Sequence, residues 1–247
     1  MLIVANWKAY VEDLGKAKKL VSLAKKLARE AACSIVLAPP APFIGEFALA
    51  NRSKVAFSAQ DVSLTTGGAE TGEITAQACA AAGATYAIIG HSERRAKGDT
   101  DTIVAEKLAH ALAVSLTPIL CVGEHGRDRE GRYLSFVREE ITAALASLTN
   151  KERSRVIVAY EPLWAIGKTA DASISPDDLA EMALYIRKVL AELLPGKSSQ
   201  HSLVLYGGSV EATNIRDLAR ATHIDGFLVG HASTDGTTFA ALVKELS

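Results

Sequence analysis

The stretch that decides the fold lies at residues 156–168, which read VIVAYEPLWAIGK. Its first four residues are apolar and mostly β-branched, which is typical of a short buried strand. Pro162 favours an extended conformation in the residue before it and so leaves the carboxylate of Glu161 at the strand's exit. An apolar loop tipped by Gly167 follows, as in an active-site lid. The alternative for this stretch alone is a strand end with a solvated glutamate.

Short apolar runs alternate with helical stretches on both sides of this stretch. The expected strands are Leu2–Ala5, Ser34–Ala38, Val55–Ala59, Tyr86–Ile89, Pro118–Val122, Val156–Ala159, Leu203–Leu205 and Gly226–Val229. The expected helices lie near Val11–Glu30, Phe43–Asn51, Ile74–Ala82, Thr102–Val114, Tyr133–Leu148 and Pro176–Leu193, and a short helix follows each of the last two strands. Either Asp99 or Asp101 is expected to cap the helix near Thr102.

This alternation predicts an α/β fold, a single-domain (β/α)8 barrel that covers residues 1–247. No linker-like or low-complexity segment divides the chain, which favours one domain. A doubly wound open sheet is the alternative. It normally has fewer strands and a glycine fingerprint after the first one, whereas the first strand here ends in Asn6, Trp7 and Lys8.

The composition limits the classes of function. A formal net charge of -1 over 247 residues argues against a nucleic-acid partner or an anionic membrane surface. The first residues form too short an apolar run for a signal peptide, and no transmembrane span is expected. Cys33, Cys79 and Cys121 are widely spaced and follow no metal-binding pattern, so we expect reduced thiols, no metal site and a cytoplasmic location.

Polar or glycine-rich residues follow five of the expected strands. In a (β/α)8 barrel the C-terminal ends of the strands form the active-site face. The residues at these exits are Asn6 and Lys8, His91 and Glu93, Glu161, Gly207-Gly208-Ser209, and Gly230-His231. Each alone has a plainer interpretation, as a surface lysine, a loop histidine or a simple turn. Their convergence on one face indicates a shared site.

The residue types at this face suit proton transfer on a phosphorylated carbon acid. Glycine turns that lead into helices expose N–H groups to an anion, so Ser209 and Gly230 favour a phosphate site. Glu161 can act as a base next to a carbonyl, and a neutral His91 can donate a hydrogen bond to the carbonyl oxygen. Lys8 can offset negative charge on the phosphate and on a developing enediolate.

These residues lie within strings that together resemble the triosephosphate isomerase family over essentially the whole chain. The strings are Ala5–Lys8, Gly72–Ile74, Ile89–Arg95, Cys121–Glu124, Ala159–Gly167, Tyr206–Val210, Asp225-Gly226 and Leu228–Gly230. The resemblance implies the interconversion of dihydroxyacetone phosphate and D-glyceraldehyde 3-phosphate, a step of glycolysis and gluconeogenesis, on a small-molecule triose phosphate and without a cofactor or metal. It implies that Glu161 is the base, that His91 and Asn6 stabilise the enediolate, and that Lys8 acts electrostatically.

The resemblance also assigns the surrounding residues. Glu93 would support the catalytic groups, and Gly167, Ser209 and Gly230 would donate backbone N–H groups to the phosphate. The loop Ser63–Gly72 is similar to the family's loop that reaches into a second subunit. A homodimer is therefore expected, with Thr71 near the site of the other subunit.

Two departures from the family's pattern leave alternatives open. Gly167 continues directly into Lys168 without the usual Thr-Gly, so we expect the second hinge of the lid near Asp171–Ser173. The family's second glycine after Gly230 is replaced by His231, which we expect to add an imidazole near the phosphate. One alternative is an isomerase of a four-carbon sugar phosphate such as erythrulose phosphate. The other is a non-catalytic barrel that binds a phosphorylated ligand.

Overall fold

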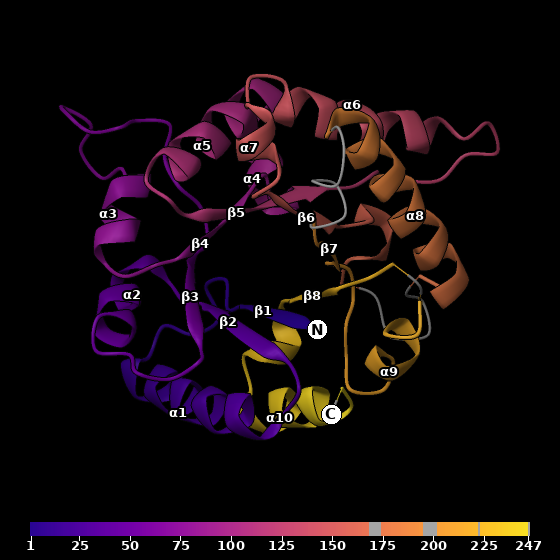
Figure 1. Ribbon diagram of the computed structural model, residues 1–247. Helices are drawn as coiled ribbons and strands as arrows, with labels where there is room; N and C mark the ends of the chain where they lie inside the picture. Colours follow the sequence, from indigo (N-terminus) through magenta and orange to yellow (C-terminus); the bar gives the residue numbers. More distant parts are fainter. Residues whose placement is uncertain (168–173, 195–201, 222, 247) are drawn as a thin grey trace.

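The computed structural model of the chain describes residues 1–167, 174–194, 202–221 and 223–246. Its centre is a closed barrel of parallel strands that pair in sequence order, with β8 returning to β1 (Figure 1). The strands are β1 Leu2–Asn6, β2 Ser34–Ala38, β3 Ala56–Ala59, β4 Tyr86–Ile89, β5 Thr117–Val122, β6 Ile157–Tyr160, β7 Val204–Tyr206 and β8 Gly226–Val229. The barrel confirms the predicted fold class. It excludes the doubly wound sheet, which is open and has two edge strands.

Helices form an outer ring around the strands (Figure 1). They are α1 Leu14–Glu30, α2 Ala41–Ala48, α3 Ala76–Ala81, α4 Ser92–Arg95, α5 Asp101–Ala113, α6 Arg132–Leu145, α7 Asn150–Arg153, α8 Pro176–Leu193, α9 Ile215–Leu218 and α10 Gly236–Lys244. Two 3-10 turns, η1 Leu163–Ala165 and η4 His231–Ser233, follow β6 and β8. Among the helices of the described residues, none is long and apolar enough to cross a membrane.

Alternate side chains of the strands enter two different cores. Those that point into the barrel form one cluster: Leu2, Val4, Val36, Ala38, Ile88, Ile119, Cys121, Ile157, Ala159, Leu205 and Leu228. Those of opposite parity pack outward against the helices in a larger cluster. Because strand side chains alternate in direction, the residue two positions after an inner one continues the inner face. Asn6 follows Val4 in this way and Glu161 follows Ala159, so both stand at the top of the interior.

Helix starts differ from the predicted ones where a cap or a proline sets them. α1 begins at Leu14 rather than near Val11, because Asp13 Oδ1 accepts a hydrogen bond from the N–H of Lys16 at 2.6 Å. α2 begins at Ala41, earlier than predicted, because a proline in its first turn has a φ that already suits a helix.

α5 has a different cap from the predicted one. The prediction that Asp99 or Asp101 caps this helix is wrong, because the cap is Thr100, whose side chain accepts from the N–H of Ile103. Asp99 is held instead by the buried Lys107, whose Nζ lies 2.7 Å from its carboxylate. A buried ammonium needs such a partner more than a helix start does.

Two single-turn helices, α4 and α7, were not predicted. A helix of four residues is too short to show a 3.6-residue period. The predicted helix to Leu148 ends at Leu145, and α7 starts afresh behind a capping box formed by Thr149 and Glu152. α4 matters for the site, because it begins directly after His91.

Candidate active site

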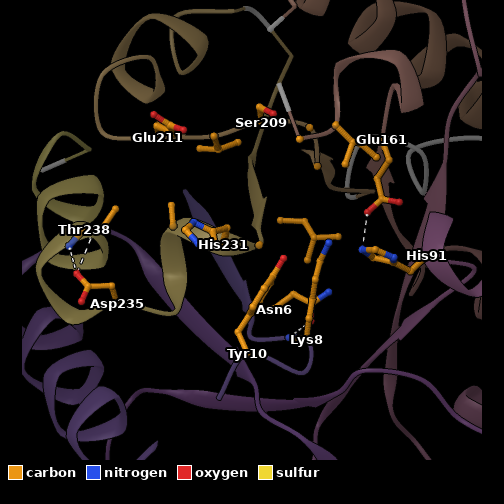
Figure 2. Close-up of a pocket in the computed structure, with 18 residues that line it drawn as sticks. Asn6, Lys8, Tyr10, His91, Glu161, Ser209, Glu211, His231, Asp235 and Thr238 are labelled. Carbon is orange, nitrogen blue, oxygen red and sulfur yellow. Dashed lines mark hydrogen bonds and ion pairs between the residues drawn. The ribbon is translucent and has the colours of Figure 1, made fainter. Parts of the chain in front are cut away.

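A cavity of about 470 Å³ lies at the C-terminal ends of the strands (Figure 2). The structure places all the predicted catalytic and phosphate-binding residues on its wall: Asn6, Lys8, His91, Glu161, Gly167, Ser209, Gly230 and His231. They come from the exits of β1, β4, β6, β7 and β8. The convergence expected from the sequence is therefore present in space.

The imidazole of His91 and the carboxylate of Glu161 face each other at one end of the cavity (Figure 2). His91 Nε2 lies 3.3 Å from Glu161 Oε1, and both side chains are nearly inaccessible to solvent. His91 Nδ1 accepts a hydrogen bond from the backbone N–H of Glu93 at 3.1 Å. A ring nitrogen that accepts a hydrogen bond carries no proton, so the imidazole proton lies on Nε2. The pair thus combines a carboxylate acceptor with an imidazole donor.

Three surrounding groups hold Glu161 in one orientation. The backbone N–H of Ser92, in the first turn of α4, donates to Glu161 Oε2 at 3.1 Å. The backbone N–H of Glu161 donates to the carbonyl of Val122 at 2.8 Å. Gly207 gives the side chain its room, since a Cβ at this position would lie 2.8 Å from Glu161 Cγ. The carboxylate is therefore positioned by β5, α4 and the turn after β7 together.

Lys8 adopts a backbone conformation that is unusual for a residue with a side chain. Its φ is 47°, in the left-handed region, which carries a penalty of about 1–2 kcal/mol for residues other than glycine. Gln60 holds this conformation, because its Nε2 donates to the carbonyls of Lys8 and Ala38, each at 2.9 Å. The N–H of Lys8 donates to Asn6 Oδ1 at 3.0 Å. Gln60 cannot be identified from the sequence, because a single glutamine after a strand has no distinctive pattern.

Glu93 contacts both the ammonium group of Lys8 and the imidazole of His91. Its Oε1 lies 2.6 Å from Lys8 Nζ, while its backbone N–H donates to His91. Partial burial alone would raise the pKa of Glu93, but the hydrogen bond from Lys8 and the charge of that ammonium lower it below its ordinary value. Glu93 is therefore ionised at neutral pH and holds Lys8 beside the cavity. This contact suits the supporting role that the sequence predicted.

The opposite end of the cavity is rich in glycine. Gly167 has a φ of 69°, which favours glycine, and it lies at the tip of the apolar loop. Ser209 Oγ donates to the carbonyl of Ala165 at 2.9 Å and so ties the turn after β7 to this loop. A Cβ at Gly230 would lie 3.4 Å from Lys8 Cε, so the absence of a side chain leaves space beside the ammonium. The backbone is close to the cavity at all three turns.

His231 projects into the same end of the cavity and contacts Tyr10 (Figure 2). The two rings meet edge to face, with centroids 5.5 Å apart and planes at 89°. Tyr10 was not singled out in the sequence, nor were the acidic side chains Glu211 and Asp235 that also line this end. The structure therefore adds an aromatic and acidic rim to the predicted glycine turns.

The start of the apolar loop is anchored by a buried carboxylate. Glu124 Oε1 accepts hydrogen bonds from Tyr160 Oη and Trp164 Nε1, each at 2.8 Å. The carbonyl of Glu124 accepts from the N–H of Leu163 at 2.9 Å. Arg127 lies over the Trp164 ring, with its guanidinium carbon 5.4 Å from the centroid. Glu124 lies within one of the strings that carry the family resemblance, but no role was predicted for it, because its contacts are visible only in the folded chain.

Two predicted features lie elsewhere. Thr71 is exposed on the loop Ser63–Gly72, which projects beside α3 and does not line the cavity (Figure 1). The predicted second hinge at Asp171–Ser173, with Lys168, lies outside the described residues. Within the described parts of the chain, no group of three or more His, Cys, Asp or Glu side chains could hold a metal ion.

The strand exits of this barrel bring together a carboxylate, an imidazole donor, an ammonium group and glycine turns. These features define a class of barrel enzymes that catalyse proton transfer in anionic substrates. The family model described as triosephosphate isomerase matches residues 1–246. This chain therefore belongs to the triosephosphate isomerase family.

Curated relatives carry the same name. The triosephosphate isomerase of Corynebacterium diphtheriae is 37% identical over 248 residues, which cover 98% of this chain and 95% of the relative. That of Moorella thermoacetica is 39% identical, with 98% and 97% covered. That of Mycobacterium avium is 43% identical over 194 residues, or 78% of this chain and 74% of the relative.

Proposed function

We propose that this cavity interconverts dihydroxyacetone phosphate and D-glyceraldehyde 3-phosphate through an enediolate, with Glu161 as the base. The contact between Glu161 Oε1 and His91 Nε2, 3.3 Å apart with both side chains nearly inaccessible to solvent, is the observation that carries the assignment. Glu161 takes a proton from the carbon next to the carbonyl and returns it to the neighbouring carbon. His91 Nε2–H donates to the oxygen on which negative charge develops, and the hydroxyl proton of the enediolate passes to that oxygen through the imidazole, so that the carbonyl reforms on the neighbouring carbon.

Lys8 and Asn6 complete the charge stabilisation. Lys8 stands between His91 and His231 in Figure 2, and its side chain lies beside Gly230, so its ammonium would be near both charged parts of a bound triose phosphate. Asn6 fixes the backbone of Lys8 through its side-chain oxygen. The scheme calls for no cofactor, because an enediol interconversion needs only a base, a hydrogen-bond donor and a positive charge.

The phosphate belongs at the glycine-rich end in this proposal. Gly167, Ser209 and Gly230 would donate backbone N–H groups to it, and His231 would add an imidazole. Their position on the same cavity wall as the catalytic pair supports this placement. Neither the four-carbon alternative nor a non-catalytic binder is favoured, because the chain matches the triosephosphate isomerase family along its length.

We also propose that the chain forms one domain and acts as a cytoplasmic homodimer. The loop Ser63–Gly72 borders a second cavity of about 760 Å³, and the apolar Leu64 and Ile74 beside it are 40 and 45% exposed. Exposed apolar side chains around a hollow are typical of a protein interface. The free thiols, all buried, suit a reducing compartment.

Replacement of the base tests the catalytic assignment. Glu161→Gln keeps the shape of the side chain but removes its basicity, so kcat should fall by about 10²–10⁴-fold. Glu139→Gln, on the exposed side of α6, serves as a control for the loss of one negative charge. Turnover of glyceraldehyde 3-phosphate is measured beside the phosphates of erythrose and erythrulose. Near-normal turnover by a folded Glu161→Gln variant would contradict the assignment.

A further inference from the structure

A second carboxyl group lies buried behind the base. Glu140 is on the inner face of α6 and is only 4% exposed. Glutamates are rarely buried to this extent unless they are paired, because removing a carboxylate from water is unfavourable. The catalytic scheme above does not use Glu140. The contacts of Glu140 indicate its role.

Glu140 makes two contacts that connect it with the catalytic face. Its Oε2 accepts a hydrogen bond from the backbone N–H of Gly123 at 2.8 Å. Its Oε1 lies 3.4 Å from Arg95 Nη1, and the same nitrogen lies 2.7 Å from Asp101 Oδ1. Arg95 belongs to α4, the helix whose first N–H donates to Glu161. One carboxylate thus joins α6 to the exit of β5 and to α4.

Gly123 carries this support to the base. A Cβ at Gly123 would overlap the backbone carbonyl of Glu161, so the two backbones are in direct contact. The neighbouring residue Val122 accepts the backbone N–H of Glu161 at 2.8 Å. The hydrogen bond from Gly123 to Glu140 therefore holds the segment on which the backbone of Glu161 rests.

A small cavity of about 150 Å³ is bordered by both Glu140 and the base. Its wall includes Arg95, Cys121, His125, Glu140 and Glu161. A cavity of this size has room for a water molecule beside the polar groups of Arg95, His125 and Glu140. Burial, followed by the charge of Glu161, keeps the pKa of the Cys121 thiol well above its ordinary value, and this thiol stays neutral.

The protonation of Glu140 is coupled to the charge of the base. Burial raises the pKa of Glu140 to about 7, Arg95 and the N–H of Gly123 oppose this rise, and the negative charges of Asp101 and Glu161 add to it. Repulsion between two negative charges acts on both groups. An ionised Glu140 therefore favours the uptake of a proton by Glu161, which is the first step of the reaction.

We propose that Glu140 is a positioning residue for Glu161, which holds the exit of β5 against the base and, when ionised, promotes proton transfer to it. The inference rests on the proposed role of Glu161 as the base. It adds a charge that acts from behind the catalytic carboxylate without contacting the substrate. Activity then follows the ionisation of Glu140.

The pH dependence of a conservative variant tests the role of the charge. Glu140→Gln keeps an oxygen that can accept from Gly123 but cannot ionise. We expect the ratio of its kcat to that of the unmodified chain to be near 1 at pH 6 and to fall to roughly one third at pH 8.5, the order expected for a partly screened like charge. Taking the ratio cancels the titration of the substrate phosphate.

Two further variants separate charge from support. Glu139→Gln, on the same helix but exposed, should give a ratio near 1 at every pH. Glu140→Met removes the acceptor as well as the charge, so its kcat should fall below that of Glu140→Gln at every pH, with KM little changed. A ratio for Glu140→Gln that does not vary with pH overturns the role of the charge. Equal kcat for folded Glu140→Met and Glu140→Gln overturns the role of the hydrogen bond.

A titration without turnover tests the coupling itself. Carbon-13 NMR of the glutamate carboxyl carbons follows Glu140 in the unmodified chain and in Glu161→Gln. The midpoint for Glu140 should be lower in the variant, because a neighbouring negative charge has been removed. An unchanged midpoint overturns the coupling. Full activity of Glu161→Gln would instead overturn the proposed base, so the two failures are distinguishable.

Discussion

Gly207 should be a catalytic requirement although it has no side chain. A Cβ at this position would lie 2.8 Å from Glu161 Cγ and 3.4 Å from Glu161 Oε1. Two non-bonded carbons attract best at about 3.5–4.0 Å, so Gly207→Ala must push the base away by roughly 0.7 Å or more. The backbone of Gly207 cannot retreat freely, because its N–H donates to the carbonyl of Tyr160 at 2.8 Å.

This displacement should reduce activity far more than stability. A misplacement of about 1 Å in a catalytic group can lower the rate by about 10²-fold, whereas overpacking lowers the free energy of unfolding by about 1–3 kcal/mol. We therefore expect kcat for Gly207→Ala to fall by about 10²-fold while the protein still folds. Steady-state turnover of glyceraldehyde 3-phosphate gives kcat, and urea unfolding gives the stability.

A matched glycine variant provides the control. At Gly45 in α2, an added Cβ would meet its nearest neighbours at 3.9 and 4.0 Å, which is ordinary contact. Gly45→Ala should therefore leave kcat unchanged. If Gly207→Ala retained more than about half of the normal kcat, the reasoning that Gly207 makes room for the base would be refuted.

Three further outcomes follow from the site, the loop and the buried carboxyl. Inorganic phosphate should compete with triose phosphate, and unphosphorylated dihydroxyacetone should be a very poor substrate, because binding of the phosphate stabilises the transition state; equal turnover of both would contradict the phosphate end. Thr71→Arg should shift the molecular mass measured by light scattering from dimer to monomer, and a fully active dimer would count against the proposed interface. Because the pKa of Glu140 is raised from 4.5 to about 7, the contribution of this group to the free energy of unfolding falls as the pH rises between these values. Between pH 5 and pH 8, the Tm of Glu140→Gln should therefore decrease less than the Tm of the unmodified chain.

The sequence by itself determined the strand order and which residues meet at the proposed active site. Apolar runs of strand length recur along the chain, and parallel strands that close into a barrel place their exits on one face. Asn6, His91 and Glu161 each follow such a run directly or within two residues, so their convergence could be inferred from position alone. Residues at strand exits can be predicted from the sequence, because each one directly follows its strand in the chain.

Only the tertiary structure identified the residues that support this chemistry. Gln60 holds Lys8 across 52 positions of sequence, and Ser92 holds Glu161 across 69. Glu140 lies in α6, where a glutamate is ordinarily expected on the exposed face. In the structure it is buried and contacts Gly123 and Arg95. Such contacts depend on the distance between elements after packing and have no period or motif in the sequence. The pKa of a buried group likewise depends on charges contributed by several separate elements, which only the folded chain brings together.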